Sequence, residues 1–263
     1  MYNVVQFTLS GEFAFFKKPD TNKEERLFTY SCVHKVILMG ILGAIIGLGG
    51  YNQRKKGEQH PEFYDKLKNI KVAIVPKNEN SYIRKKFHTF NNSVGYASNE
   101  NGNNLVSKEQ WLEKPIWEII VLTDKTYYKD NGLDIDVNLL SKIEEYLLNK
   151  KSIYIPYLGK NEHPANILNP VKNTITLSKV DEGDVVLMDS LYDDDLFTPV
   201  EVMTRGLSVP KVRYYRYSEF LPVSLDGVFG LYEFKKLTHT NKNLKSNTDL
   251  DLYELNNKKI YLI

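Results

Sequence analysis

The sequence has a single cysteine, Cys32, among its 263 residues. One thiol forms no internal disulfide and supplies no cysteine-based zinc site, so we expect a reducing, cytoplasmic setting. The first ten residues have neither the basic start of a secretory signal nor its small-residue cleavage pattern after an apolar run, so we expect no signal peptide. The longest apolar stretch, 36–50, is shorter than the about 20 residues that cross a membrane, which predicts a buried helix and no membrane partner.

The sequence also lacks an excess of one charge sign. Its 35 Lys and Arg residues nearly balance its 33 Asp and Glu residues, so the net charge is +2. This balance argues against a domain that binds nucleic acid over its whole surface. The charges are nevertheless segregated. Residues 51–91 hold ten basic and four acidic groups (+6), 205–217 hold four basic groups and no acid (+4), and 181–195 hold seven acids and no base (−7). We therefore expect separate basic and acidic surfaces.

The common enzyme signatures are absent. There is no phosphate-binding GxxxxGK[ST] loop, no GxGxxG after a strand, no HExxH, no GxSxG and no paired-cysteine metal spacing. The five histidines, at 34, 60, 88, 163 and 239, are scattered without the helical spacing of metal ligands. We therefore expect no metal, no cofactor and no conventional enzyme.

Aromatic residues are abundant, with 18 Tyr and 12 Phe, which indicates a globular, β-rich protein. The pattern of apolar residues predicts strands and helices in turn. A structureless loop of about 40 residues is unusual, so the long interval 77–115 predicts an inserted hairpin, with a mobile tip at 99–104. The predicted strands are 3–16, with a bulge at Gly11, then 70–76, 116–123 and 152–158; the predicted helices are 33–48, N-capped by Thr29 or Ser31, and 134–149.

The order of these elements is βαββαβ, which is the ferredoxin-like, RRM-like motif of an α+β protein. We expect this domain to span 1–168, with the hairpin insertion at about 78–114 between its second and third strands. From there on, short strand-like runs alternate with polar turns. They predict a β-rich C-terminal domain over 169–263.

A stripe of small residues runs along the first predicted helix. Gly40, Gly43, Ala44 and Gly47 fall at i, i+3, i+4 and i+7, on one helical face. Glycine costs about 1 kcal/mol relative to alanine inside a helix, so its repeated use indicates close packing against a sheet or a partner.

The strongest candidate for phosphate chemistry lies on the predicted hairpin. Tyr82–Phe90 interleaves Arg84, Lys85 and Lys86 with aromatic rings, a mixture that neutralises phosphates and offers faces for base stacking. A solvated hairpin with ordinary surface lysines is an equally valid interpretation. The segment 205–217 is similar in composition, and it fits RNA binding, a partner protein or a plain strand.

Two further patterns leave alternatives open. His34 and Lys35 stand at the start of the first helix, where free N–H groups attract phosphate; a capping or buried role for His34 is the alternative. The acidic run 181–195 lacks the spacing of a calcium-binding loop. It predicts a solvated loop or a docking surface for a basic subunit.

Three segments resemble a known family. Gly11–Pro19 and 29–48 look like the N-terminal signature of the CRISPR-associated Cas-five family, and 155–167 is similar to the segment that marks its type I-B members. The family is a subunit of Cascade, the RNA-guided surveillance complex of antiviral defence. The resemblance implies a ferredoxin-like domain whose hairpin insertion forms a thumb, followed by a C-terminal β domain.

The resemblance also implies a role and partners. Such subunits are non-catalytic RNA-binding proteins that cap the 5′ handle of the crRNA, contact the Cas-seven backbone subunit and the Cas-eight large subunit, and lie near the target DNA. Relatives often have proline just before the first helix, where this chain has 31–33. The residues implied to contact the handle are Tyr30, Ser31, His34 and Lys35 beside the helix, and Arg84, Lys85, Lys86 and His88 on the thumb.

One branch of the family, the type I-C members, cleaves precursor crRNA with a Tyr, Lys and His set. A base removes the ribose 2′-OH proton, the oxygen attacks the adjacent phosphate, and a cation stabilises the crowded anion. Tyr30, Lys86 and His88 are the residues that this chain could use, although Phe87 separates the Lys and His that are adjacent in that branch. A metal-independent endoribonuclease is therefore the alternative function.

Overall fold

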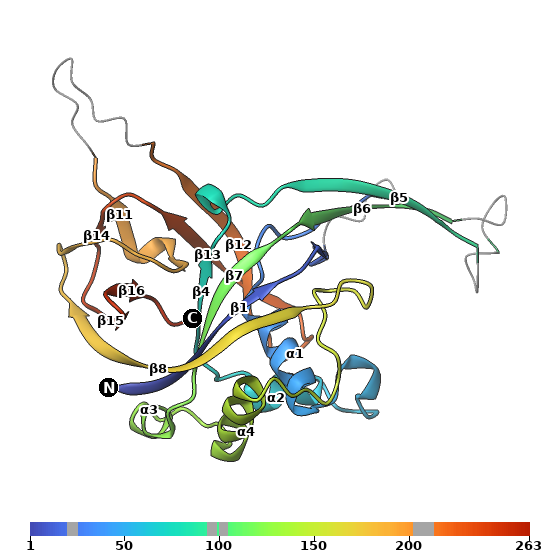
Figure 1. The fold of residues 1–263 in the computed structure, drawn as a ribbon, viewed down its shortest axis with the longest axis horizontal. Helices are drawn as coiled ribbons and strands as arrows, with labels where there is room; N and C mark the ends of the chain where they lie inside the picture. Colours follow the sequence, from blue (N-terminus) through green and yellow to red (C-terminus); the bar gives the residue numbers. More distant parts are fainter. Residues whose placement is uncertain (20–25, 94–98, 100–104, 202–212) are drawn as a thin grey trace.

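The computed structural model describes residues 1–19, 26–93, 99, 105–201 and 213–263 and is a strand-rich α+β structure (Figure 1). The expected α+β class is confirmed. Its centre is a six-stranded antiparallel sheet in the order β16-β15-β8-β1-β7-β4. These strands are β1 (Tyr2–Ser10), β4 (Val72–Pro76), β7 (Ile116–Leu122), β8 (Asn166–Val180), β15 (Leu250–Leu255) and β16 (Lys258–Ile260).

Both faces of the central strands are buried, which explains their unbroken apolar runs. Trp117 and Ile119 of β7 belong to the core under the helices, whereas Ile120 and Leu122 face a second core. Past β16 the chain returns to the opposite edge, where the Ile263 amide donates to the Val72 carbonyl at 2.9 Å. The sheet therefore curls until it is nearly closed.

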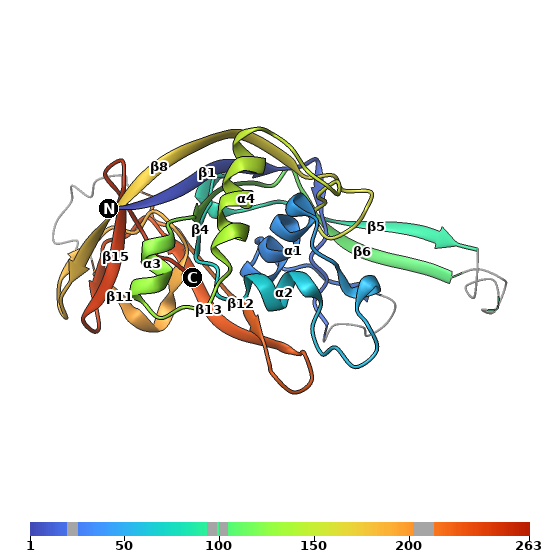
Figure 2. The ribbon, with the colours of Figure 1, turned by 90° about the horizontal axis from the view of Figure 1, so that it is seen from below.

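The helices lie mainly on one side of the sheet, as Figures 1 and 2 show. They are α1 (Lys35–Ile46), α2 (Glu62–Leu67), α3 (Lys125–Asp130) and α4 (Val137–Leu148). Asp124 and Asp136 cap α3 and α4 by accepting backbone N–H bonds. Within the described ranges, none of the helices has the length and apolarity needed to span a membrane.

The predicted N-cap of α1 is wrong. The helix begins after His34, whose side chain makes no cap bond. Thr29 and Ser31 lie further upstream, and their hydroxyl groups have other partners. The Thr29 hydroxyl accepts from the Phe16 amide at 2.9 Å and donates to the Tyr30 carbonyl.

Side chains of other segments of the same chain pack against the small residues of α1. A Cβ on Gly43 would lie 2.6 Å from the Phe63 side chain of α2, and one on Gly47, which ends the helix at φ +86°, would meet Ile153 at 2.7 Å. The close packing predicted from the stripe is present. It is made by α2 and the segment at 153 rather than by a sheet.

The predicted hairpin insertion is present. Its strands, β5 (Lys85–Asn92) and β6 (Leu105–Glu113), pair antiparallel and project from the body (Figure 1). At the base of the hairpin, β6 also pairs with β2 (Phe13–Ala14) and, in parallel, with β3 (Arg26–Leu27). The tip expected to be mobile, 99–104, lies outside the described residues apart from Asn99.

The fourth strand predicted at 152–158 is wrong. Ile153 and Tyr154 donate their amides to the carbonyls of Ile45 and Ala44 at the end of α1, so this segment satisfies the helix terminus instead of a sheet. Their side chains are exposed. The strand that pairs with β1 is β8, which begins at Asn166.

The C-terminal half is rich in short strands, as the alternation predicts. β8 continues through the boundary expected between 168 and 169, although its pairing with β1 has a register shift between Leu168 and Val171. β15 and β16 join the central sheet, so the division into two domains stays a prediction. The other strands form two three-stranded sheets: β10 (Tyr192–Asp193), β13 (Tyr232–Thr240) and β12 (Arg216–Leu225); β11 (Phe197–Pro199), β14 (Leu244–Ser246) and β9 (Val185–Val186).

Candidate nucleic-acid interface

The base of the hairpin is joined to the loop before α1. Lys85 Nζ donates to Ser31 Oγ at 2.6 Å, and the Ser31 amide donates to Glu219 Oε2 of β12 at 2.8 Å. Three segments that are far apart in the sequence therefore meet at Ser31.

Glu219 is the anionic centre of this junction. It also accepts from Lys18 Nζ at 2.6 Å and from the Tyr217 hydroxyl at 2.9 Å. Burial lowers the pKa of Lys85, and the nearby Glu219 carboxylate offsets only part of this effect. The ammonium groups of Lys18 and Lys85 therefore lie together beside this carboxylate, and clustered cations attract anions.

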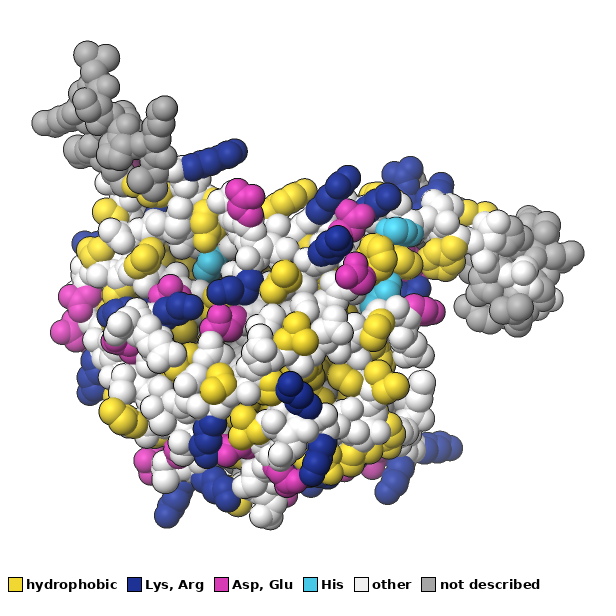
Figure 3. All heavy atoms as spheres, in the orientation of Figure 1, with side chains coloured by type: hydrophobic (Ala, Val, Ile, Leu, Met, Phe, Trp, Pro, Cys, Tyr) yellow, Lys and Arg dark blue, Asp and Glu magenta, His cyan; other side chains and the backbone are white. Residues whose placement is uncertain are grey.

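Two more cations extend from the same strand region. The Arg84 side chain is 78% exposed and forms an ion pair with Glu113 at 3.2 Å. Lys86 is exposed, and it makes no hydrogen bond or ion pair with any residue that the structure describes. In Figure 3 basic side chains gather over the base of the hairpin, with hydrophobic and histidine side chains beside them.

Exposed rings accompany these cations. Tyr82, Phe87 and Phe90 are 71%, 44% and 36% exposed. Phe87 lies on the same strand face as Lys85, and its ring meets Phe28 edge-on at 5.5 Å between centroids. The arrangement therefore supplies ring faces for bases next to ammonium groups for phosphates.

His88 lies on the opposite face of the hairpin and takes part in packing. Its ring stacks on Trp111 with a centroid distance of 4.2 Å and an interplanar angle of 19°. Its Nε2 atom is buried and has no hydrogen-bond partner among the residues that the structure describes. His88 is therefore held against the protein rather than presented to solvent.

The residues at the start of α1 lie inside the molecule. Tyr30 and His34 are 4% and 1% exposed, and their rings are 5.2 Å apart. Burial lowers the pKa of His34 to about 3, so the imidazole is neutral at pH 7. Lys35 is 8% exposed, and its pKa is lowered to about 7 by burial, with smaller contributions from Lys71 and Lys235.

The structure thus brings Ser31 and Lys85 together, with Arg84 and Lys86 adjacent on the chain, whereas Tyr30, His34 and Lys35 lie below the surface. Sequence reasoning missed Lys18 and Glu219. Lys18 lies within the resembling segment Gly11–Pro19, but Glu219 follows the basic cluster without any signal that pairs it with Ser31.

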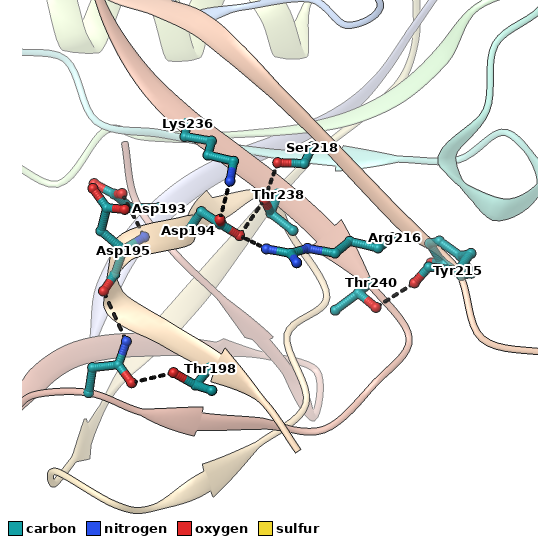
Figure 4. Close-up of polar contacts among 11 residues, drawn as sticks. Asp193, Asp194, Asp195, Thr198, Tyr215, Arg216, Ser218, Lys236, Thr238 and Thr240 are labelled. Carbon is teal, nitrogen blue, oxygen red and sulfur yellow. Dashed lines mark hydrogen bonds and ion pairs between the residues drawn. The ribbon is translucent and has the colours of Figure 1, made fainter. Parts of the chain in front are cut away.

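The interpretation of 181–195 as a solvated or docking segment is wrong for two of its acids (Figure 4). Asp194 forms ion pairs with Arg216 and with Lys236, the latter at 2.9 Å, and accepts from the Thr238 hydroxyl at 2.7 Å. Asp193 pairs with Lys235 at 2.6 Å. Burial acts to raise the pKa of Asp194, but these hydrogen bonds outweigh it and lower the pKa.

Most of the other charged residues of 181–195 and of the basic cluster at 205–217 are either exposed or outside the described residues. The exposed acids, for which docking stays a prediction, are Asp181, Glu182, Asp184 and Asp195. Of the basic cluster at 205–217, Arg205 and Lys211 lie outside the described residues. Across the part of the chain that is described, no group of three or more His, Cys, Asp or Glu side chains is arranged to hold a metal ion.

Comparison with known proteins gives structural likenesses only. No family model and no curated protein matches the sequence. A CRISPR protein from Archaeoglobus fulgidus is similar at 9% identity, covering 98% of this chain and 97% of that chain, with a TM-score of 0.46. A chain of a CRISPR RNA-guided surveillance complex is similar at 10% identity, covering 92% and 91%, with a TM-score of 0.46.

A third likeness is to a functionally uncharacterized protein from Streptococcus mutans, at 12% identity, covering 93% of each chain, with a TM-score of 0.35. The chain is therefore structurally similar to CRISPR proteins. At these identities and TM-scores the likenesses carry no argument about function.

Proposed function

We propose that this chain is a non-catalytic RNA-binding subunit of a type I, I-B-like CRISPR Cascade complex, of the Cas-five family. It holds the 5′ handle of the crRNA at the base of the β5–β6 hairpin. The observation that carries the proposal is the Lys85–Ser31 hydrogen bond, which joins the hairpin to the loop before α1. The resemblance of 11–19, 29–48 and 155–167 to family segments supports it.

The order of the central strands supports a ferredoxin-like unit. β1, α1, β4, β7, α4 and β8 follow one another as βαββαβ, and their strands stand in the order β8-β1-β7-β4. The hairpin enters between β4 and β7, where the family has its thumb. From the resemblance to the Cas-five family we infer that the hairpin acts as a thumb that contacts the Cas-seven backbone subunit. We also infer that the Cas-eight large subunit and the target DNA lie nearby.

The chemistry of the junction favours single-stranded RNA. Lys18 and Lys85 lie beside Glu219, and exposed Lys86 adds a cation on the other face of β5, so the base of the hairpin attracts phosphates. The exposed ring of Phe87 offers a stacking face that only an unpaired base can reach.

The packing of the candidate catalytic residues favours the non-catalytic role. Tyr30 is buried, and the His88 ring is stacked on Trp111 with Nε2 enclosed. A general base must reach the 2′-OH of its substrate. We expect no cleavage of repeat RNA by the chain in the presence of a chelator; cleavage that is abolished by His88→Ala would establish the endoribonuclease instead.

Binding of handle-bearing RNA by the purified chain and by the assembled complex tests the proposal. Reversal of three hairpin charges, Arg84→Glu, Lys85→Glu and Lys86→Glu, should abolish binding at physiological salt. The matched control reverses three exposed lysines away from the hairpin, Lys125→Glu, Lys129→Glu and Lys150→Glu, and should retain binding. Equal affinities for the two variants would contradict the proposal.

A further inference from the structure

A loop of the body packs against one face of the hairpin. Its neck is closed by the bridge between Tyr157 and Pro164 and by the Leu158 amide, which donates to the His163 carbonyl at 2.7 Å. Gly159 stands at φ +88°, and a Cβ there would lie 1.8 Å from the Phe15 carbonyl oxygen, so the loop is fitted tightly onto the body. It presents Lys160 and His163 to the hairpin.

Lys160 binds a buried carboxylate of the hairpin. Its Nζ lies 2.9 Å from Oε2 of Glu109, a β6 residue that is only 6% exposed. The same oxygen accepts from Trp111 Nε1 at 2.7 Å. The ammonium group also lies 4.9 Å from the centroid of Phe90 and 5.6 Å from that of Trp111, within cation–π range.

His163 completes the contact through its ring. It is 3% exposed and meets Trp111 edge-on at 4.4 Å, while His88 stacks on Trp111 at 4.2 Å. Phe13 of β2 joins the cluster, 5.5 Å from Trp111. Neither ring nitrogen of His163 has a hydrogen-bond partner within the described part of the structure, so the ring contributes packing rather than polar bonds.

The pairing of the hairpin with other strands of the body is short. β2 and β3 contribute two residues each to the pairing with β6, and an isolated two-stranded hairpin is marginally stable in water. The contacts of Lys160 and His163 with Glu109 and Trp111 hold the hairpin from a second direction.

We propose that Lys160 and His163 form a latch that fixes the direction in which the hairpin leaves the body, so that they are positioning residues for RNA binding. This rests on the proposed function, because the latch aligns Lys85 with Ser31 on the opposite face of the hairpin. The latch face itself is closed by side chains, and Lys160 neutralises Glu109 instead of contacting RNA.

Hydrogen exchange of the full chain without RNA, followed by RNA titration, tests the latch. Lys160→Met keeps the aliphatic stem but leaves Glu109 without its cation. Amides of 85–91 and 106–112 should then exchange on the order of tenfold faster, while amides of β1 are unchanged. Lys160→Arg keeps the ion pair and the ring contacts and should restore slow exchange.

RNA affinity should fall with Lys160→Met while the salt dependence of binding keeps its slope, because no phosphate contact is lost. Unchanged exchange together with a shallower slope would overturn the proposal, since Lys160 would then be a phosphate contact. Unchanged exchange and unchanged binding would also overturn it. Because exchange is measured without RNA, the latch can hold even where the proposed function fails.

A second pair of variants distinguishes the effect of His163 ring packing from that of the His163 ring nitrogens. His163→Phe keeps the contact with Trp111 and removes two buried nitrogens that have no partner, so hairpin exchange should be as slow as in the natural protein or slower. His163→Ala should accelerate it. Equal acceleration by both variants would contradict a latch made by ring packing.

Discussion

Lys85 Nζ donates a hydrogen bond to Ser31 Oγ at 2.6 Å, and this bond joins two parts of the chain that are 54 residues apart. Lys85 belongs to the projecting hairpin and Ser31 to the loop that leads into the first helix. Glu219 lies at the same junction, where it accepts from Lys18 Nζ and its carboxylate acts on the Lys85 ammonium group.

Removing hairpin charges should weaken the salt dependence of RNA binding. Lys86→Met should lower the slope of log K against log salt by about 0.7, the value for one phosphate of a single strand. Ser31→Ala removes the hydrogen bond with Lys85 but no charge, so its slope should stay unchanged. Titrations at four salt concentrations measure both. A slope that falls with Ser31→Ala and not with Lys86→Met would be inconsistent with the assigned contacts.

Phe87 should act as a stacking surface. Phe87→Ala should weaken binding of single-stranded RNA by about 1–3 kcal/mol, the usual contribution of one base stacked on a ring. Phe87→Tyr keeps the ring and should bind normally. Fluorescence anisotropy gives the affinities, and an equal loss for both substitutions would exclude stacking.

Two glycines of α1 should respond oppositely to the same substitution. Gly43→Ala places a Cβ 2.6 Å from Phe63 and should destabilise the fold by about 1–3 kcal/mol. Gly40→Ala meets nothing nearer than 3.8 Å and should stabilise it by up to about 1 kcal/mol. Urea denaturation of the two variants makes the comparison. Similar changes would mean that Phe63 does not lie against the helix.

The stability of the fold should fall in acid partly through His34. Burial lowers the pKa of His34 from 6.5 in the unfolded chain to about 3. As the pH drops below 6.5, the unfolded chain takes up a proton that the folded chain does not, so stability is lost between pH 6.5 and about 3. His34→Phe suits the surrounding rings and should remove up to about 1.4 kcal/mol per pH unit from this slope.

The comparison is made by urea unfolding from pH 7 to pH 4. If His34→Phe and the natural protein lose stability in parallel over this range, His34 is not the buried neutral group described above.

Asp194 should be needed for folding rather than for binding a partner. Its carboxylate pairs with Arg216 and Lys236 and accepts from the Thr238 hydroxyl. Because both cations are partly exposed, Asp194→Asn should destabilise the fold by about 1–2 kcal/mol. Glu182→Gln changes an exposed acid of the same segment and should have little effect. Thermal unfolding tests both, and an equal response would contradict the pairing.

Patterns local to the chain were predictable, and contacts between distant segments were not. The apolar runs of β4 and β7 and the long interval between them predicted two strands and a hairpin, because burial on both faces and loop length leave a direct trace in sequence. The run at 152–158 has the same composition as a strand. Its amides instead complete the end of α1, a choice made by tertiary contact.

The candidate site shows the same division. The cations interleaved with aromatic rings predicted an RNA-binding role for the hairpin, including Lys85. The hydrogen bond between Lys85 and Ser31 was not predictable, because only the folded chain brings these two residues together. His34 and Lys35 carry suitable groups, but the core encloses them. The acids of 181–195 were grouped by sequence, and only the fold brings Lys235 and Lys236 to them.

Photocrosslinking of the assembled complex, with 4-thiouridine placed in the crRNA handle, tests the central claim most directly. We predict crosslinks to peptides that contain 82–90 and to the loop at 26–33, with loss of both in the Arg84→Glu, Lys85→Glu, Lys86→Glu variant. Handle RNA that crosslinks to other surfaces and not to these two segments would contradict the assignment of this junction as the RNA site.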